Sequence, residues 1–219
     1  VDLIRRKLGQ TAHALTWPLL TKPDGSKYGK TAGGETIWLS PNKMSPYRFY
    51  QAWIGVDDSE VRKLLLQLTF LSLEEVEVLV AEHEKEPQKR VGQRTLAGEL
   101  TGIVHGEAAA ASAIEASAVL FDADVDITAV SESALEFVNG EVPSTAIQKL
   151  GSGIIDLLVE SELCQSRKDA KRAVTEGGIY LNGGRVTDPD FSPSKGNLLH
   201  EKYLLLRRGK KQWHLLKVG

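Results

Sequence analysis

The spacing of apolar residues predicts a long helical region in the middle of the chain. Serine followed by proline at Ser45-Pro46 is typical of a helix start, because the serine side chain caps the first turn and proline fits its first position. Later helices are predicted to begin near Asp58, Ser72 and Gln88, where apolar residues recur at helical spacing. An alanine-rich run continues this pattern, so we expect an all-helical region.

The pattern changes after the alanine-rich run. Short helices are expected at 131–138 and 143–150. The sequence Gly-Ser-Gly at 151–153 then predicts a flexible joint.

The residues before the helical region have a less regular pattern. The opening residues predict an amphipathic helix that ends near Gly9. The apolar stretch 14–20 is short enough for a buried strand of an α/β sheet, and Pro18 confines such a strand to an edge or an end. Residues 23–25, Pro-Asp-Gly, then predict a turn.

The last part of the chain predicts a mixture of helices and strands. Apolar residues from Ile154 predict one helix, and Ser166 with Asp169 three residues later predicts a capping box that opens a second. Asn-Gly at 182–183 is a strong signal for a hairpin with a two-residue turn. A second hairpin is expected around Gly209.

Composition and charge place the chain among ordinary globular proteins. Its 219 residues allow about one or two domains, and 42% hydrophobic with 26% charged residues indicates a folded core. The net charge of −2 hides an asymmetry: from Ile154 onward there are 12 Lys and Arg against 8 Asp and Glu, whereas the preceding residues have 15 against 21. A basic C-terminal segment after an acidic one favours binding of a polyanion such as nucleic acid. The alternative is a basic surface that is only solvated.

Cysteine content and hydropathy exclude several classes of protein. Cys164 is the only cysteine, which excludes an internal disulfide or a cysteine zinc cluster and fits a reducing compartment. No stretch is apolar for long enough to span a bilayer. The sequence starts at Val1 without methionine, inside an amphipathic helical pattern, so we expect it to be truncated. The two-lysine run at 27–31 lies too close to this start to carry a whole active site, so we expect the second half of an enzyme.

Residues 27–31, Lys-Tyr-Gly-Lys-Thr, are the strongest candidate for chemistry. Two mobile ammonium groups beside a glycine suit negative charge that builds on phosphate oxygens during a reaction. A P-loop is excluded, because a Walker motif needs four residues between its first glycine and its Gly-Lys pair, and Gly25 is followed by only three. Ordinary solvated turn lysines are the alternative.

Basic residues cluster on the predicted C-terminal elements. On the helix after Ser166 the cations share one face, while Ala170, Ala173 and Val174 form the apolar face. Further cations lie on the two hairpins. The set is Arg167, Lys168, Lys171, Arg172, Arg185, Arg207, Arg208, Lys210 and Lys211. Such a cluster suits the phosphates of RNA, and a solvated helix face is the alternative.

Four stretches together resemble one family. They are Leu19 to Thr31, Ser45-Pro46-Tyr47 with Phe49-Tyr50-Gln51, Val104-His105-Gly106-Glu107, and Ser166 to Gly183. In this order, and across the whole chain, they resemble the bacterial tyrosyl-tRNA synthetases, which are class I aminoacyl-tRNA synthetases. The first resembles the family's mobile signature loop, which varies around Lys-Met-Ser-Lys-Ser. The last resembles the small RNA-binding fold named after ribosomal protein four of the small subunit.

The resemblance implies tyrosine–tRNA ligase activity. Tyrosine attacks the α-phosphate of ATP, pyrophosphate leaves, and the tyrosyl-adenylate then esterifies its tRNA. By match of position, Lys27 and Lys30 contact the departing pyrophosphate, Thr31 is a hydroxyl donor, and Gly29 belongs to the same ATP-binding loop. Mg²⁺ accompanies ATP, and no metal is assigned to this chain. The His-Ile-Gly-His signature and the tyrosine pocket lie upstream in these enzymes, so we expect this segment alone to be inactive.

The resemblance also implies a multidomain fold that combines α/β, all-α and α+β parts. We expect the end of a class I, Rossmann-like nucleotide-binding domain at 1–44, a helical anticodon-side domain at 45–138, a linker at 139–153 and an RNA-binding domain at 154–219. In the family the last domain meets the anticodon stem and the long variable arm of the tRNA. The implied partners are tRNA-Tyr, tyrosine, ATP and a second copy bound through the upstream part, in the cytoplasm and without a membrane.

Two other functions remain open from the residues alone. The terminal part is also compatible with a non-enzymatic RNA-binding module, although that function leaves the lysine loop without a role. Tryptophan enzymes share the catalytic fold, but they generally lack the terminal RNA-binding domain. Specificity for tyrosine therefore depends on the resemblance.

Overall fold

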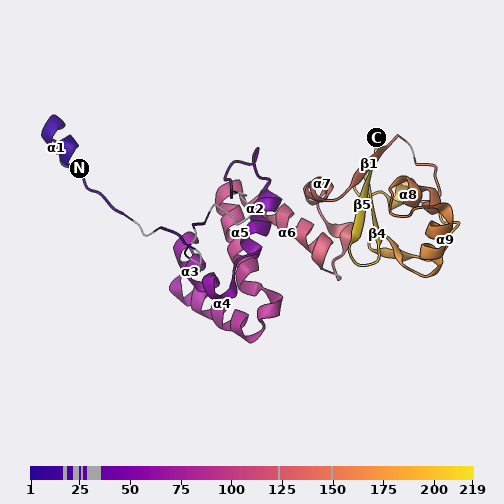
Figure 1. Ribbon diagram of the computed structural model, residues 1–219, viewed down its shortest axis with the longest axis horizontal. Coiled ribbons are helices and arrows are strands. Elements are labelled where there is room, and N and C mark those ends of the chain that lie inside the picture. Colours follow the sequence, from indigo (N-terminus) through magenta and orange to yellow (C-terminus); the bar gives the residue numbers. More distant parts are fainter. Residues whose placement is uncertain (17–18, 22–24, 26, 29–35, 123, 149) are drawn as a thin grey trace. The chain divides into compact units, whose positions relative to one another are not determined.

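A computed structural model of the chain describes residues 1–219 with the exception of 17–18, 22–24, 26, 29–35, 123 and 149. The chain divides into two compact units, Val1–Trp38 and Leu39–Gly219 (Figure 1). No helix built from the described residues combines the length and the apolar character needed to cross a membrane.

The first unit contains helix α1 (Asp2–Leu8). This helix ends as predicted at Gly9, which has a left-handed φ of 63° and donates its N–H to the carbonyl of Arg5. None of the residues of α1 is buried. The helix therefore has an apolar stripe that nothing in the described part of the unit covers.

The buried strand predicted at 14–20 is wrong for the described residues. Leu15 is 91% exposed and Leu19 is 64% exposed. A buried strand needs neighbouring strands to satisfy its main-chain groups. The described part of this unit supplies an isolated antiparallel bridge between Thr21 and Lys27 and no longer ladder.

Five helices form the first part of the second unit among the described residues. They are α2 (Pro46–Ile54), α3 (Asp58–Leu68), α4 (Leu73–Lys85), α5 (Val91–His105) and α6 (Glu107–Phe121). Helix α2 packs against α5 and α6, and helix α3 packs against α4 and α5. Phe49, Leu64, Leu65 and Leu96 are almost completely buried between them.

The predicted start signals of α2 and α4 are confirmed. The side chain of Ser45 accepts a hydrogen bond from the N–H of Arg48 at 3.2 Å. At the start of α4, the N–H of Glu75 donates to Ser72 Oγ at 3.3 Å, and the N–H of Ser72 donates to Glu75 Oε2 at 2.7 Å. This reciprocal pair is a capping box, and it fixes the helix start that the sequence predicts near Ser72.

Helix α5 differs from its prediction at both ends. It begins at Val91 rather than near Gln88, because the 3-10 turn η1 (Pro87–Lys89) and the left-handed Arg90, with φ of 53°, precede it. At its other end Gly106 adopts a φ of 89°, which separates α5 from α6. The alanine-rich run therefore forms a helix of its own.

The helix predicted at 143–150 is wrong. Helix α7 (Glu132–Glu141) follows the 3-10 turn η2 (Ile127–Ala129), and strand β1 (Ser144–Ile147) comes next. Strand β1 pairs in parallel with β5 (Gln212–Val218), and the N–H of Leu215 donates to the carbonyl of Pro143. Pairing with a distant segment overrides the local helical pattern. This strand also lies inside the segment that the sequence analysis treats as a linker.

The second unit ends in a five-stranded sheet with the order β1-β5-β4-β2-β3. The remaining strands are β2 (Ile179–Leu181), β3 (Gly184–Val186) and β4 (Tyr203–Arg208). Both predicted hairpins are confirmed. Asn182 and Gly183 have φ of 48° and 82°, which is the left-handed pair that a tight two-residue turn requires, and Gly209 at the other hairpin has φ of 62°.

Helices α8 (Ile154–Glu160) and α9 (Arg167–Thr175) pack on one face of this sheet. Their buried residues join Ile179, Leu204 and Leu206 in one apolar core. Helix α9 ends before Gly177, which has φ of 70°. Residues 144–219, which contain the sheet, α8, α9 and the 3-10 turn η3 (Lys195–Asn197), are called the C-terminal module below.

Residues of η2 and α7 lie beside the opposite face of the sheet. His200 Nε2 lies 2.7 Å from the carbonyl oxygen of Val130, and Lys202 forms an ion pair with Glu132. A side chain at Gly183 would meet Ile127 at 3.3 Å. The sheet is therefore enclosed on both faces over part of its area.

Candidate functional site

The structure describes part of the predicted signature loop. Lys27 is exposed and forms the antiparallel bridge with Thr21, and the N–H of Tyr28 donates to the carbonyl of Leu20 at 3.2 Å. Pro23 and Asp24 of the predicted turn lie outside the described residues. The remaining predicted loop residues, Gly29, Lys30 and Thr31, lie outside the described residues.

Helix α9 presents the first group of predicted RNA-binding residues. Ser166 caps the helix by accepting a hydrogen bond from the N–H of Asp169. Lys168 and Lys171 are exposed. The two arginines of this helix are exposed but paired: Arg167 forms an ion pair with Asp156, and Arg172 donates to Asp169 at 3.1 Å.

Arg208 is half-buried, and its side chain is held by partners inside the C-terminal module. Its guanidinium donates to the carbonyl of Leu163 at 2.7 Å and to both carboxylate oxygens of Asp169 at 2.8 and 3.0 Å. These hydrogen bonds hold the pKa of Asp169 below its ordinary value and raise the pKa of Arg208. Arg208 therefore joins β4 to α9. Its charge is already compensated by Asp169, so it is a poor candidate for binding an RNA phosphate.

The capping box predicted at the start of α9 is only half formed. Ser166 accepts its hydrogen bond, but the carboxylate of Asp169 accepts one from the N–H of Gln165 rather than from that of Ser166. Both oxygens of this carboxylate also accept hydrogen bonds from Arg208, which help to set where it lies.

The sheet places four side chains in direct cross-strand register. Arg185 on β3 pairs with Tyr180 on β2, Tyr180 pairs with Arg207 on β4, and Arg207 pairs with Trp213 on β5. Directly opposed residues point to the same face of a sheet. We call these four residues the arginine–aromatic row.

The arginines of the row lie over the aromatic rings. Cζ of Arg207 is 4.2 Å from the ring centroid of Tyr180 and 5.1 Å from that of Trp213. Cζ of Arg185 is 5.4 Å from the ring centroid of Tyr180, and its Nη2 donates to the hydroxyl of Tyr180 at 2.9 Å. These three contacts are cation–π interactions, which hold the guanidinium groups in place without neutralising their charge.

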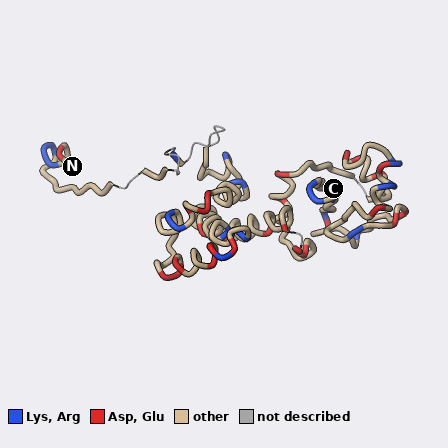
Figure 2. The backbone as a smooth tube through the Cα atoms, turned by 60° about the horizontal axis from the view of Figure 1, so that its bottom comes forward, with Lys and Arg blue, Asp and Glu red and all other residues tan. Residues whose placement is uncertain are grey.

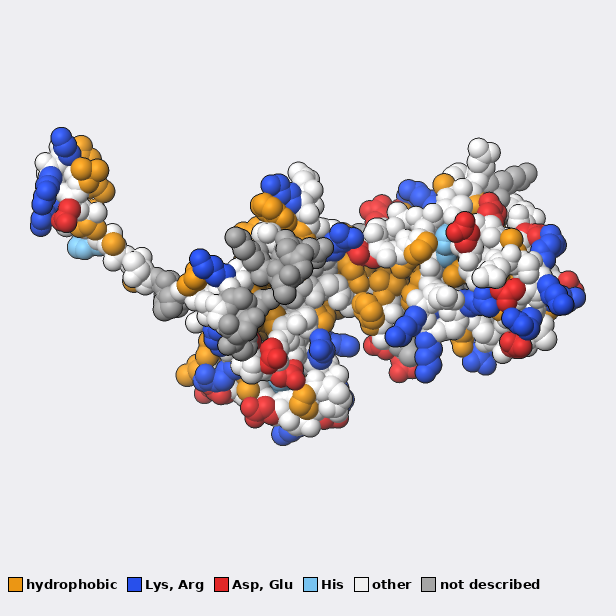
Figure 3. All heavy atoms as spheres, viewed as in Figure 1, with side chains coloured by type: hydrophobic (Ala, Val, Ile, Leu, Met, Phe, Trp, Pro, Cys, Tyr) orange, Lys and Arg blue, Asp and Glu red, His pale blue; other side chains and the backbone are white. Residues whose placement is uncertain are grey.

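Lys210 and Lys211 complete the predicted set at the tip of the second hairpin, beside Gly209, where both are exposed. In the described part of the chain, six predicted cations therefore have no acidic partner. They are Lys168, Lys171, Arg185, Arg207, Lys210 and Lys211. Figure 2 shows that basic and acidic positions are interspersed along the C-terminal module, and Figure 3 shows several Lys and Arg side chains on its surface.

Sequence reasoning missed Tyr180 and Trp213 as members of this surface. The signal was present, because the predicted turns at 182–183 and Gly209 set the register of the two hairpins. Counting outward from these turns places Tyr180 opposite Arg185 and Trp213 opposite Arg207. The pairing of β2 with β4, which joins the two hairpins, has no local signal.

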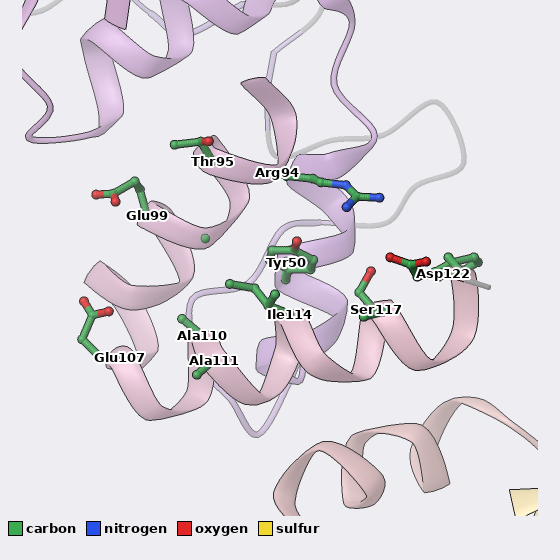
Figure 4. A pocket seen from close by; sticks show the side chains of 13 residues that line it. Tyr50, Arg94, Thr95, Glu99, Glu107, Ala110, Ala111, Ile114, Ser117 and Asp122 are labelled. Carbon is green, nitrogen blue, oxygen red and sulfur yellow. The ribbon is translucent and has the colours of Figure 1, made fainter. Parts of the chain in front are cut away.

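A hollow of about 470 Å³ lies between α2, α5 and α6 (Figure 4). Tyr50 of α2 lies at its base, where burial raises the pKa of the phenol. Arg94 and Glu99 of α5 and Asp122 after α6 contribute charges of both signs to its lining. Small residues of α6 leave the space open. None of the residues that line this hollow is a predicted site residue.

Metal ligands do not cluster in the described residues, where no group of three or more His, Cys, Asp and Glu side chains could hold a metal ion. Cys164 is buried, and this burial raises the pKa of its thiol. Its thiolate form, which binds metals and attacks electrophiles, is therefore disfavoured. The chemistry that this part of the chain offers is that of cations and aromatic rings.

Two family profiles match the chain. The profile described as tRNA synthetases class I (W and Y) matches residues 1–122, which is more than half of the 219 residues. The profile described as Tyrosine--tRNA ligase SYY-like C-terminal domain matches residues 134–216.

Curated relatives align with the whole chain. The Tyrosine--tRNA ligase of Streptomyces griseus is 44% identical over 100% of this chain and 51% of its own length. That of Opitutus terrae is 42% identical over 99% and 52%, and Tyrosine--tRNA ligase 1 of Enterococcus faecalis is 43% identical over 100% and 52%. The chain spans about half the length of the curated relatives it matches.

These matches confirm the resemblance to bacterial tyrosyl-tRNA synthetases, with the chain corresponding to their C-terminal half. They also confirm the fold at the level of a class I synthetase with a tyrosyl-tRNA synthetase C-terminal domain. The chain thus belongs to the class I tRNA synthetases of the tryptophan and tyrosine group.

Proposed function

We propose that the chain is the C-terminal part of a tyrosine–tRNA ligase, which activates tyrosine with ATP and transfers it to tRNA-Tyr. The observation that carries the proposal is the match of residues 134–216 to a domain described for tyrosine–tRNA ligases. The class I family covers enzymes for both tryptophan and tyrosine, so the match at 1–122 alone leaves the amino acid open. The names of the relatives, which align along the whole chain, favour tyrosine.

In this proposal the signature loop acts on the triphosphate of ATP. Lys27 and Lys30 contact the departing pyrophosphate, Thr31 donates a hydrogen bond from its hydroxyl, and Gly29 lets the backbone approach the phosphates. Negative charge moves onto the pyrophosphate oxygens as the bond to the α-phosphorus breaks, so cations placed there stabilise the transition state more than the ground state. The exposure of Lys27 supports this role. Mg²⁺ enters as part of the ATP substrate.

The C-terminal module binds tRNA through its cations in the same proposal. Lys168, Lys171, Lys210 and Lys211 are exposed, so their ammonium groups can reach phosphates. Residues 1–44 complete the nucleotide-binding domain and residues 45–138 lie on the anticodon side. The full-length enzyme forms a homodimer through its upstream part and works in the cytoplasm.

The amino acid is tested with the full-length gene product, purified tRNA and ATP–pyrophosphate exchange. We expect exchange that depends on tyrosine, followed by charging of tRNA-Tyr. Exchange that depends on tryptophan instead would assign the chain to the other branch of the family. No exchange with any amino acid, from a folded enzyme, would contradict the ligase proposal.

The role of the loop is tested by Lys27→Ala and Lys30→Ala in the full-length enzyme. Removing one preorganised donor costs ~3 kcal/mol of barrier, so we expect adenylate formation to slow by roughly a hundredfold. The dissociation constant of tyrosine should stay almost unchanged, because these lysines contact ATP. Pre-steady-state fluorescence or quenched-flow kinetics measures both quantities.

Tyr28→Phe is the matched control for these lysine variants, since it changes the same loop without removing a charge. It should form adenylate at nearly the normal rate. Normal rates in both lysine variants would contradict the proposed contact with pyrophosphate.

A further inference from the structure

Arg207 differs from its neighbour Arg208 in how its charge is satisfied. Successive residues of a strand point to opposite faces, so Arg208 faces α9 and Arg207 lies on the other face, within the arginine–aromatic row. The guanidinium of Arg208 has a carboxylate and a carbonyl as partners. Nε of Arg207 is buried and has no hydrogen-bond partner in the part of the chain that the structure describes.

The rings of Tyr180 and Trp213 restrict where the guanidinium of Arg207 can lie. It is held between the two rings, at 4.2 and 5.1 Å from their centroids. Arginine normally loses considerable side-chain freedom when it binds a ligand, and a guanidinium already fixed by stacking loses less. Arg185, which lies over the same Tyr180 ring and donates to its hydroxyl, adds a second fixed cation.

The arginines of α9 are less suited to binding a phosphate, because carboxylates already compensate their charges. Arg167 is paired with Asp156 and Arg172 with Asp169. A phosphate that binds either of them must compete with a carboxylate that already holds the charge. The row contains no acidic side chain, so a phosphate meets its cations without that competition.

We infer that the arginine–aromatic row is the main phosphate-binding element of the C-terminal module, with Arg207 as the contacting cation and Tyr180 and Trp213 as positioning residues. The inference rests on the proposed function in tRNA binding, and it assigns the RNA backbone to this face of the sheet rather than to α9. The row supplies fixed positive charge that matches the charge of a phosphate, and its planar guanidinium edges suit two phosphate oxygens.

Binding of the 219-residue chain to a tRNA-Tyr transcript tests the inference, measured by filter binding at several salt concentrations. Arg207→Ala removes a phosphate contact, so the slope of log K against log salt should fall by about one. Arg207→Lys keeps the charge, so the slope should stay unchanged. Its affinity should nevertheless fall about two- to fivefold, because an ammonium group does not stack between the rings as a guanidinium does. If the role of Arg207 were purely structural, the salt slope would not fall in Arg207→Ala and stay unchanged in Arg207→Lys while both variants lose affinity.

Two further variants test the positioning residues. Tyr180→Phe retains the ring and should bind nearly as well as the unchanged chain, whereas Tyr180→Leu should lose affinity like Arg207→Lys. Melting temperatures of all variants show whether a loss of affinity comes from unfolding. Tyr180→Leu binding as tightly as Tyr180→Phe, with both folded, would overturn the positioning role.

Lys195→Ala is the matched control, because it removes one exposed cation from the same module outside the row. It should change affinity and slope little. Equal losses in Lys195→Ala and Arg207→Ala would overturn the inference in favour of unspecific charge, with the proposed function intact. Loss of binding on replacing Lys168 and Lys171 by alanine, with none on replacing Arg207, would assign the RNA to α9 and also overturn it. No binding of the transcript by the unchanged, folded chain would remove the proposed tRNA contact together with the inference.

Discussion

Asp169 is the residue at which several elements of the C-terminal module meet. Its carboxylate accepts hydrogen bonds from Arg208 on β4, from Arg172 one turn along α9 and from the N–H of Gln165 before the helix. The hydrogen bonds from Arg208 are the largest cause of its lowered pKa. A carboxylate with a lowered pKa in the folded state stabilises that state only while it is ionised.

The contribution of Asp169 to stability is therefore expected to depend on pH. It is complete above the ordinary aspartate pKa of 3.8 and is lost as the pH falls through the lower pKa of the folded state. Asp169→Asn should lower the melting temperature at pH 7, and the difference from the unchanged chain should shrink below pH 3.8. Circular dichroism melting curves across this range measure it. Asp190→Asn, at an exposed carboxylate of the same module, is the control, and a difference that stays constant with pH would contradict the expected linkage.

Among the elements, helix α4 has a start that is held by the reciprocal hydrogen bonds of Ser72 and Glu75. Ser72→Ala removes the acceptor for the N–H of Glu75 and should lower the free energy of unfolding by about 1 kcal/mol. Urea denaturation followed at 222 nm gives this free energy. Ser72→Thr keeps the hydroxyl and should recover most of the stability. Equal stability of the alanine and threonine variants would show that the cap contributes nothing.

The elements that the sequence predicted correctly are those with local chemical signals. Caps at Ser45 and Ser72 and the turn at 182–183 depend on side chains within a few residues, and all three are confirmed. Strand β1 depends instead on β5, which lies far along the chain, so the pattern at 143–150 could not reveal it. The strand predicted at 14–20 had the right composition but found no partner strand among the described residues.

In the candidate site, too, the features with local sequence signals could be predicted and those that depend on distant segments could not. Lysines and arginines of the C-terminal module could be selected from charge and helical spacing alone. The ion pair of Arg172 with Asp169 joins residues three apart on one helix, so the spacing alone could have indicated it. The ion pairs of Arg167 with Asp156 and of Arg208 with Asp169 depend on tertiary contacts, so the sequence could not show that these two charges are already compensated. The rings over which Arg207 lies required the register of three strands.

At the scale of the whole molecule, the second unit joins its helical part to its sheet through η2 and α7. Leu205 is fully buried on the sheet face that carries the arginine–aromatic row, directly opposite Leu215. The residues just before β4 contact the segment of η2 and α7, through His200 with the carbonyl of Val130 and through Lys202 with Glu132. A substitution that destabilises this face should therefore destabilise α7 as well as the sheet.

Leu205→Ala tests this coupling. A buried leucine reduced to alanine costs about 2–5 kcal/mol, so the free energy of unfolding should fall by that amount. Native-state hydrogen exchange should show faster exchange in α7 and in β4 together. Leu66→Ala, at a leucine that is 38% exposed, should change stability by less than about 0.5 kcal/mol. Faster exchange in β4 with unchanged α7 would contradict the coupling.

The short outer strands of the sheet affect how the protein behaves in concentrated solution. Strand β3 has three residues, one of them the exposed Arg185, and β1 has four and follows Pro143. Long, flat, uncharged edge strands let the sheets of separate molecules pair with one another and form fibrils. Short or charged edge strands prevent this pairing. The folded sheet should accordingly resist edge-to-edge association between molecules in concentrated solution.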